Sequence, residues 1–166
     1  MPTRNTILDI LNKAYQIELD GYTFYSMTAE RAEKPAVRAL FEKLAADEQQ
    51  HQQYLREVAS HLKEQDPASV KVPGPVPDLS SYSDVVFTDE VRQQAEGAEF
   101  EAGVLSVGLS IESNSIAHYT GAAKNAPDER LRGFYQFLAA WERQHLIALQ
   151  NAYKAVRGDF WQKSGF

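Results

Sequence analysis

The 166-residue chain contains no cysteine. Disulfide bonds, thiolate catalysis, cysteine-ligated zinc sites and cysteine-ligated iron centres are therefore excluded within it. No segment approaches the roughly 18 to 20 consecutive apolar residues of a membrane-spanning helix. The N-terminal residues also lack the apolar stretch of a signal peptide. These absences favour a cytoplasmic protein that does not interact with a membrane.

Basic residues are in the minority. The chain has 17 lysines and arginines against 23 aspartates and glutamates, which gives a net charge of −6. An acidic balance argues against nucleic acid or an anionic membrane surface as a partner. The composition, 43% hydrophobic and 24% charged, is that of an ordinary globular protein. The length favours a single domain over residues 1–166.

A Glu-x-x-His motif occurs twice, as Glu48 with His51 and as Glu142 with His145. On a helix, positions three apart lie on one face and are separated by one turn. A carboxylate and an imidazole placed in this way can bind one metal ion together. A single such motif is more often a solvated helix face, so the interpretation depends on what accompanies it.

Each motif is preceded by a lone glutamate at the same distance. Glu18 lies 30 residues before Glu48, and Glu112 lies 30 residues before Glu142, so the two halves are related by an offset of 94. The same offset relates five further pairs: Leu11 and Leu105, Tyr25 and Tyr119, Leu44 and Leu138, Ala45 and Ala139, and Ala46 and Ala140. The chain therefore contains an internal repeat of a helix pair.

Apolar residues at steps of three and four predict helices over about 6–31, 36–64, 88–124 and 127–157. Gly158 is expected to end the last helix, and residues 158–166 form an aromatic tail. Residues 66–87 contain four prolines and are predicted to be non-helical: Pro67, Pro73, Pro75 and Pro77.

The length of the 66–87 segment predicts the topology. Its 22 residues can span roughly 70 Å when extended, whereas a helix of the predicted length is about 44 Å long. The segment can therefore return along the bundle and start the third helix parallel to the second. This predicts an all-α four-helix bundle of two hairpins joined by a long crossover. A flexible linker between two domains is the alternative, but one hairpin cannot bury both of its apolar stripes.

Six glutamates and histidines of the repeat lie within the apolar stripes, where an unpaired charge is costly. If the four stripes face the bundle interior, these six residues lie at one level of the bundle: Glu18, Glu48, His51, Glu112, Glu142 and His145. Two divalent ions would balance the charge of the four carboxylates. Mixed oxygen and nitrogen ligands suit iron or manganese better than calcium, and zinc is a possible substitute. The sequence thus predicts a two-metal site.

Tyr25 and Tyr119 each follow a lone glutamate by seven residues. One interpretation is that both are core aromatic residues. The other is functional: each hydroxyl donates a hydrogen bond that orients a ligand carboxylate, since a buried tyrosine needs a polar partner, or each ring is an electron source close to the site. The sequence leaves these two interpretations open.

On these motifs the chain resembles rubrerythrin-like members of the ferritin-like superfamily, from about residue 6 to residue 157. The resemblance implies a ferritin-like bundle, a binuclear iron centre, a homodimer, and reduction of peroxide or reaction with oxygen. Two departures matter. No rubredoxin domain is present, and Leu109 stands where rubrerythrins carry an additional glutamate, three residues before Glu112. We therefore expect slower peroxide turnover than in rubrerythrins.

We predict a di-iron oxidoreductase that takes its electrons from an external donor, since the chain has no cysteine for a second redox centre. One alternative is a ferritin-like ferroxidase that stores iron, and another is a bundle whose metal pair is only structural. A storage cage would have a native mass of about two dozen subunits. A structural metal would contribute stability without turnover.

Overall fold

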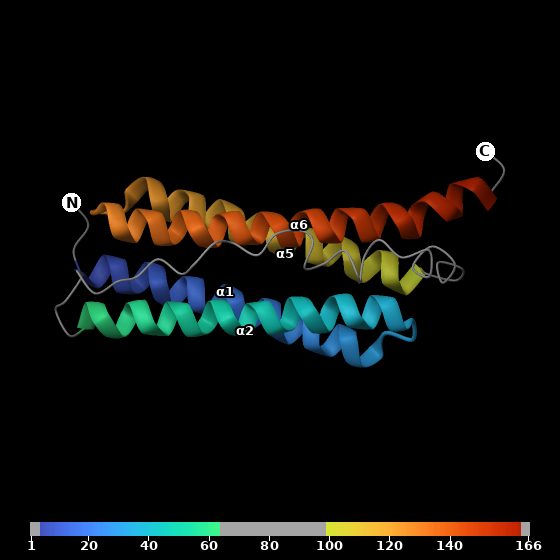
Figure 1. Cartoon of the computed structure of the whole chain (residues 1–166), viewed down its shortest axis with the longest axis horizontal. Helices are drawn as coiled ribbons and strands as arrows, with labels where there is room; N and C mark the ends of the chain where they lie inside the picture. The colour runs from blue at the N-terminus through green and yellow to red at the C-terminus, as the bar shows by residue number, and fades with distance from the viewer. Residues whose placement is uncertain (1–3, 64–98, 164–166) are drawn as a thin grey trace.

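The computed structural model describes residues 4–63 and 99–163, and every element in these two ranges is an α-helix. The helices are α1 (Arg4–Arg31), α2 (Pro35–Lys63), α5 (Glu99–Asn125) and α6 (Glu129–Lys163). Helices α1 and α2 form one hairpin, and α5 and α6 form the other (Figure 1). The predicted four-helix bundle is confirmed.

The two hairpins have the relative direction that a ferritin-like fold requires. Helices α2 and α5 run the same way along the bundle, as the colours in Figure 1 show. Two consecutive parallel helices need a connection about as long as the bundle. The crossover predicted over 66–87 and the predicted helix start near Thr88 lie outside the described residues.

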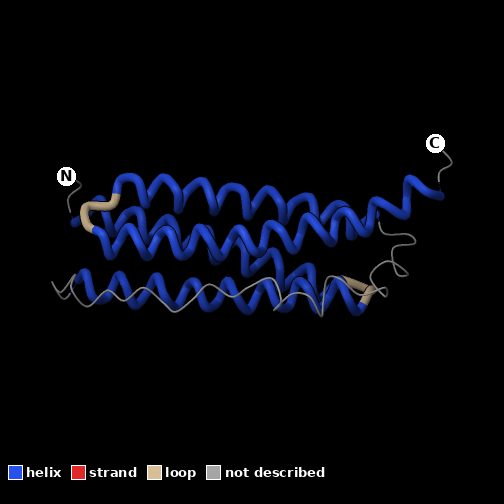
Figure 2. Tube along the Cα trace, turned by 45° about the horizontal axis from the view of Figure 1, so that its top comes forward, coloured by secondary structure: helices blue, strands red, loops and turns tan. Residues whose placement is uncertain are grey.

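Short turns join the helices within each hairpin (Figure 2). Pro35 is the first residue of α2, a position where its missing N–H has no partner to lose. The Asp128 carboxylate accepts a hydrogen bond of 2.9 Å from the Leu131 backbone N–H and so caps the start of α6. Helix starts at these two positions follow directly from the local sequence.

The prediction that α6 ends at Gly158 is wrong, because the helix continues to Lys163. A glycine inside a helix costs about 1 kcal/mol relative to alanine, but it does not force the helix to end. No proline follows Gly158 in the chain. The side chains of the predicted aromatic tail lie outside the described residues.

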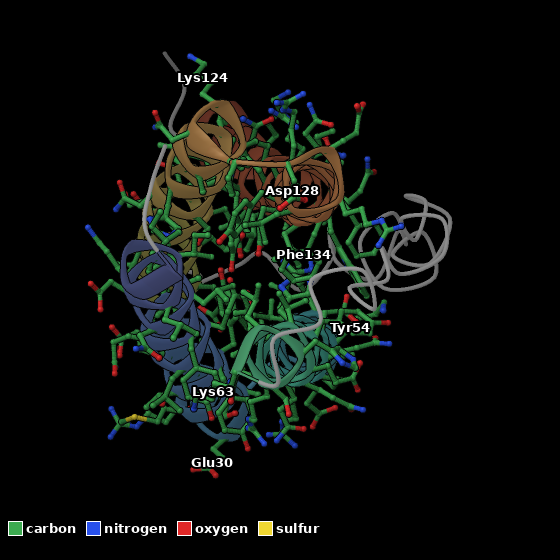
Figure 3. The ribbon with its side chains drawn as sticks, turned by 90° about the vertical axis from the view of Figure 1, so that its left-hand side faces the viewer. Glu30, Tyr54, Lys63, Lys124, Asp128 and Phe134 are labelled. Atoms are coloured by element: carbon green, nitrogen blue, oxygen red, sulfur yellow. The ribbon has the colours of Figure 1, made fainter. Side chains whose placement is uncertain are left out.

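The bundle core consists of two apolar clusters, each with residues from all four helices. One cluster includes Leu11, Leu55, Leu131 and Phe134, and the other includes Phe41, Leu44, Leu105 and Leu149. Seen along the bundle, Phe134 lies towards the middle, whereas Glu30 and Lys124 lie at the edge (Figure 3). The polar residues of the repeat belong to neither cluster.

Candidate metal centre

The structure brings all six predicted ligands together from four helices. Each is at most 3% exposed: Glu18 on α1, Glu48 and His51 on α2, Glu112 on α5, and Glu142 and His145 on α6. They form two overlapping groups that can each hold a metal ion, with the ligand atoms of each group within 4.8 Å of one another. None of the six points to solvent.

The first group is centred on His51. Its Nδ1 atom lies 2.9 Å from Glu18 Oε2 and 3.3 Å from Glu48 Oε2. A third carboxylate approaches from the other hairpin, with Glu142 Oε1 at 3.0 Å. One ring nitrogen carries at most one proton. Three carboxylate oxygens around one nitrogen therefore exceed what hydrogen bonding alone can satisfy.

The second group repeats this arrangement around His145. Its Nδ1 atom lies 3.0 Å from Glu142 Oε2 and 3.6 Å from both Glu48 Oε1 and Glu112 Oε1. Glu48 and Glu142 are therefore common to both groups, and each offers a different oxygen to each imidazole. The two rings stack with their centroids 5.4 Å apart.

Unsatisfied atoms in this cluster show that its residues fit a metal pair. Both Glu142 oxygens lie 3.0 Å from an imidazole Nδ1, yet neither makes a hydrogen bond of acceptable geometry. Glu112 Oε2 also has no hydrogen-bond partner among the described residues. Buried carboxylate oxygens are normally satisfied. Oxygens that converge without donors are those expected around cations.

Burial and repulsion alter the protonation of the metal-free cluster. Burial, followed by the charge of Glu142, raises the pKa of Glu112 to about 8. Burial, Glu142 and Glu18 raise the pKa of Glu48 well above its usual value. Burial opposes the ionisation of Glu142, but the imidazoles on its two sides hold its pKa below the usual range. Burial would lower the pKa of His51, yet Glu142 and Glu18 raise it well above the usual value.

Tyr25 and Tyr119 connect the apolar core to the polar cluster. The Tyr25 hydroxyl donates a hydrogen bond to Glu112 Oε1, and the Tyr119 hydroxyl donates one to Glu18 Oε1. Burial and the adjacent carboxylates raise the pKa of both phenols well above 10, so both keep their protons as donors. Each tyrosine thus bonds the lone glutamate of the opposite repeat, and the two bonds link α1 to α5.

Removing one of these hydroxyls should destabilise the metal-free protein. We expect Tyr119→Phe to lower the free energy of unfolding by about 1.5–3 kcal/mol, the range for a hydrogen bond to a charged group. Tyr135→Phe is a matched control, because its buried hydroxyl has no hydrogen-bond partner among the described residues and should be replaced without loss. Urea denaturation with a chelator present measures both. Equal losses in the two variants would contradict the assigned role of the Tyr119 bond.

Two further residues contact the imidazoles and were not predicted from the sequence. Asp47 Oδ2 lies 3.4 Å from His145 Nε2, and the Trp141 ring packs against the His51 ring with centroids 4.6 Å apart. Asp47 and Trp141 are themselves related by the offset of 94. Comparing unlike residues at equivalent repeat positions would have revealed them.

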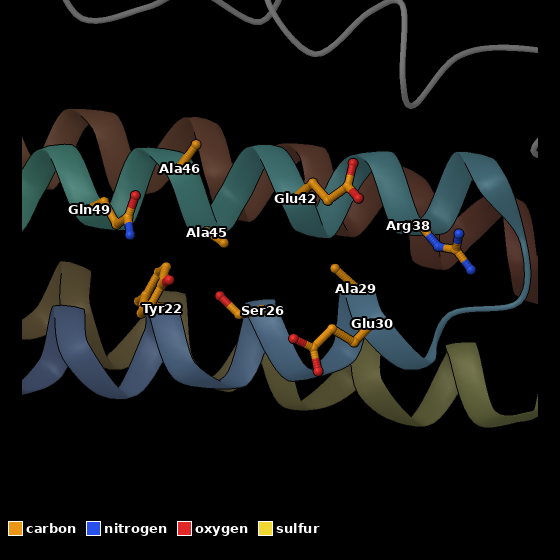
Figure 4. A pocket seen from close by; sticks show the side chains of 9 residues that line it. All are labelled: Tyr22, Ser26, Ala29, Glu30, Arg38, Glu42, Ala45, Ala46 and Gln49. Atoms are coloured by element: carbon orange, nitrogen blue, oxygen red, sulfur yellow. The ribbon is translucent and has the colours of Figure 1, made fainter.

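The first hairpin also carries a groove between α1 and α2 (Figure 4). Nine residues of α1 and α2 line it: Tyr22, Ser26, Ala29, Glu30, Arg38, Glu42, Ala45, Ala46 and Gln49. Neither the predicted ligands nor the two tyrosines that bond to them are among these nine. Arg38 also donates hydrogen bonds of 2.8 and 3.2 Å to the Ala32 carbonyl, which holds its guanidinium at the turn between the helices.

Comparison with known families decides the classification. The rubrerythrin family matches residues 9–102, more than half of the chain. The chain belongs to the rubrerythrin family. No curated protein and no solved structure matches it. The matched range contains Glu18, Glu48 and His51 but ends before the predicted ligands of the second repeat.

The rest of the site comes from the second copy of the internal repeat. Glu112, Glu142 and His145 lie beyond residue 102, but the structure places them around the same centre as their counterparts. Family membership favours a di-iron site, and the carboxylate and imidazole groups have the composition for one. None of the described helices of this rubrerythrin-family chain has the length and hydrophobicity needed to cross a bilayer.

Proposed function

We propose that this protein is a di-iron carboxylate oxidoreductase that reacts with hydrogen peroxide or oxygen. The main support is that two imidazole Nδ1 atoms each face three carboxylates, two of which, Glu48 and Glu142, are shared. Mixed oxygen and nitrogen ligands favour iron or manganese, and two divalent ions would balance four carboxylates. Zinc would fit the ligands but has no redox chemistry.

When bound, two iron ions supply the exchange of two electrons by cycling between the ferrous and ferric states. The chain's own residues bind and position them. Glu48 and Glu142 would contact both ions, whereas Glu18 and Glu112 would each contact one. Tyr25 and Tyr119 hold these two outer carboxylates in place through their hydroxyl protons.

The surroundings of the site limit access of water. Leu44 and Leu138 are fully buried, and apolar walls of this kind protect a reactive centre from side reactions. Leu109 is only partly buried and packs against the apolar cluster that contains Tyr25. It offers no carboxylate that could follow an ion as its charge changes, so we expect slower peroxide turnover than in rubrerythrins with a glutamate there.

The proposal also includes the partners of the reaction. Sustained turnover requires an external electron donor, either a protein or a small reductant, because the chain has no cysteine with which to build a second redox centre. We expect the protein to act in the cytoplasm as a homodimer. A native mass of about two dozen subunits would instead favour iron storage.

Stopped-flow oxidation of the anaerobically loaded ferrous protein tests the activity. Hydrogen peroxide or oxygen should oxidise the bound iron in a single turnover, faster than free ferrous ion in the same buffer. Oxidation should continue only when a donor is added. His145→Ala should abolish the fast phase, since one ion loses its nitrogen ligand. If neither oxidant reacts faster than with free ferrous ion, the oxidoreductase proposal fails in favour of storage or a structural metal.

A further inference from the structure

The two halves of the site differ in what lies beside Nε2 of each imidazole, the ring nitrogen that does not face the shared carboxylates. His145 Nε2 faces the Asp47 carboxylate at 3.4 Å. His51 Nε2 is buried and has no hydrogen-bond partner in the described part of the chain. The Trp141 ring lies beside the His51 ring instead, at an interplanar angle of 81°. The internal repeat makes the six predicted ligands equivalent in pairs, but its two copies differ at the equivalent positions Asp47 and Trp141.

The partner of Nε2 matters for metal binding because it determines whether the proton on that nitrogen can be donated to an acceptor. When Nδ1 binds a metal, the neutral ring has its hydrogen on Nε2. At His145 that N–H can be donated to Asp47, which fixes the ring and makes Nδ1 a better ligand. At His51 the N–H would be buried without an acceptor among the described residues. A buried donor without an acceptor is unfavourable.

Asp47 is itself held in place. Both of its carboxylate oxygens lie 3.4 Å from the Lys43 ammonium, one turn away on α2. The Asp47 residue is 7% exposed, so its carboxylate bridges a lysine near the surface and a buried imidazole. Lys43, Asp47 and His145 thus form a chain of contacts that ends at the metal centre. Trp141 is 2% exposed and provides no carboxylate at the equivalent place.

We propose that the two metal positions are inequivalent, and that the position at His145 fills first and binds more tightly because Asp47 orients that imidazole. This inference rests on the two-metal site of the proposed function. It makes Asp47 a positioning residue, which acts on the metal through His145. It also predicts a stable intermediate stage of loading in which the protein holds a single divalent ion.

Anaerobic calorimetric titration of the metal-free protein with Co²⁺ tests the order of binding. The wild-type protein should bind two ions in two steps whose dissociation constants differ by about 10–100-fold, the usual effect of an outer hydrogen-bond partner on metal affinity. Asp47→Ala should weaken the first step by a similar factor and bring the two steps together. Asp47→Asn keeps an acceptor oxygen and should recover part of the loss.

A double-mutant comparison identifies the imidazole through which Asp47 acts. In a His51→Ala background, which keeps the His145 position, Asp47→Ala should weaken Co²⁺ binding by about 10–100-fold. In a His145→Ala background it should have no effect. Glu57→Ala is the control for general charge, because Glu57 is an exposed carboxylate on the same helix and accepts a hydrogen bond from Gln53.

Three results would overturn the inference: equal affinities in the wild-type protein, the same loss in both histidine backgrounds, or filling of the His51 position first. The last is what the shorter carboxylate distances around His51 would predict by themselves. Circular dichroism establishes that each variant is folded, and Asp47→Asn replaces Asp47→Ala if the alanine variant is not. Absence of tight Co²⁺ binding in the wild-type protein would instead contradict the two-metal site itself.

Discussion

Replacing Glu142 by glutamine should remove both metal ions, whereas replacing Glu18 or Glu112 should remove only one. Glu142 offers one oxygen to each imidazole at 3.0 Å, and an amide has a single acceptor oxygen and no charge. Each outer glutamate belongs to only one of the two groups. The affinity lost at each affected position should exceed the roughly 10–100-fold effect of removing an outer partner.

The measurement is the metal content after anaerobic loading with excess ferrous ion and desalting. We expect two ions in the wild-type protein, one in Glu18→Gln and in Glu112→Gln, and none in Glu142→Gln. Glutamine preserves the side-chain volume, so the three variants differ mainly in charge and in ligand position. Retention of two ions by Glu142→Gln would show that the carboxylate does not connect the two positions.

The second large effect concerns pH and stability. Without metal, we expect the protein to become less stable as the pH rises from about 5.5 to 8.5. The pKa of Glu112 is raised to about 8 in the folded chain, so its favourable contribution is complete below the unfolded pKa and is lost as the pH rises through about 8. The raised pKa values of Glu48 and His51 act in the same direction.

The lowered pKa of Glu142 does not oppose this trend in that range. Its contribution is present above the unfolded pKa and is lost only in acid, as the pH falls towards the folded pKa. Metal binding requires deprotonated ligands and therefore becomes tighter as the pH rises. The difference in melting temperature between the metal-loaded and metal-free protein should accordingly widen with pH.

The size of the metal effect follows from mass action. Each ion present at 100 times its dissociation constant contributes about 2.7 kcal/mol, so two contribute about 5 kcal/mol. For a chain of this size that corresponds to roughly 10–20 °C in melting temperature. Calorimetry at several pH values, with chelator or with metal, measures both the effect and its pH dependence.

Glu112→Gln provides the comparison for the pH effect. It keeps the shape of the side chain and removes the buried acid, so the metal-free variant should be more stable than the metal-free parent at pH 8.5. Its stability should also change less between pH 5.5 and pH 8.5. A metal-free parent that became more stable over this range would refute the argument from buried carboxylates.

The repeat explains how much of the site was predictable. All six proposed ligands and both tyrosines were identified by their spacing, because helical periodicity fixes which side chains share a face. The partner of each tyrosine was not, since the bonds from Tyr25 to Glu112 and from Tyr119 to Glu18 cross between hairpins. Spacing within a helix carries no information about which residues of another helix lie opposite.

Two other features, the end of α6 and the residues that contact the imidazoles, could not be predicted from residue spacing. Gly158 is a weak helix former, but whether the helix stops there depends on the residues after it, and α6 continues to Lys163. Asp47 and Trp141 have no shared chemistry, so neither stood out as part of a pattern. Only the folded structure brings Asp47 to His145 and the Trp141 ring to the His51 ring.

The duplicated architecture has a consequence for symmetry. Two identical hairpins associating as a homodimer would present the same residue beside both imidazoles, since two-fold symmetry makes every contact occur twice. Joining both hairpins in one polypeptide removes that restriction and lets each half change separately. Asp47 and Trp141 are such a change, made next to carboxylates that both halves share. Fusion thus allows one binuclear site to give its two ions different surroundings.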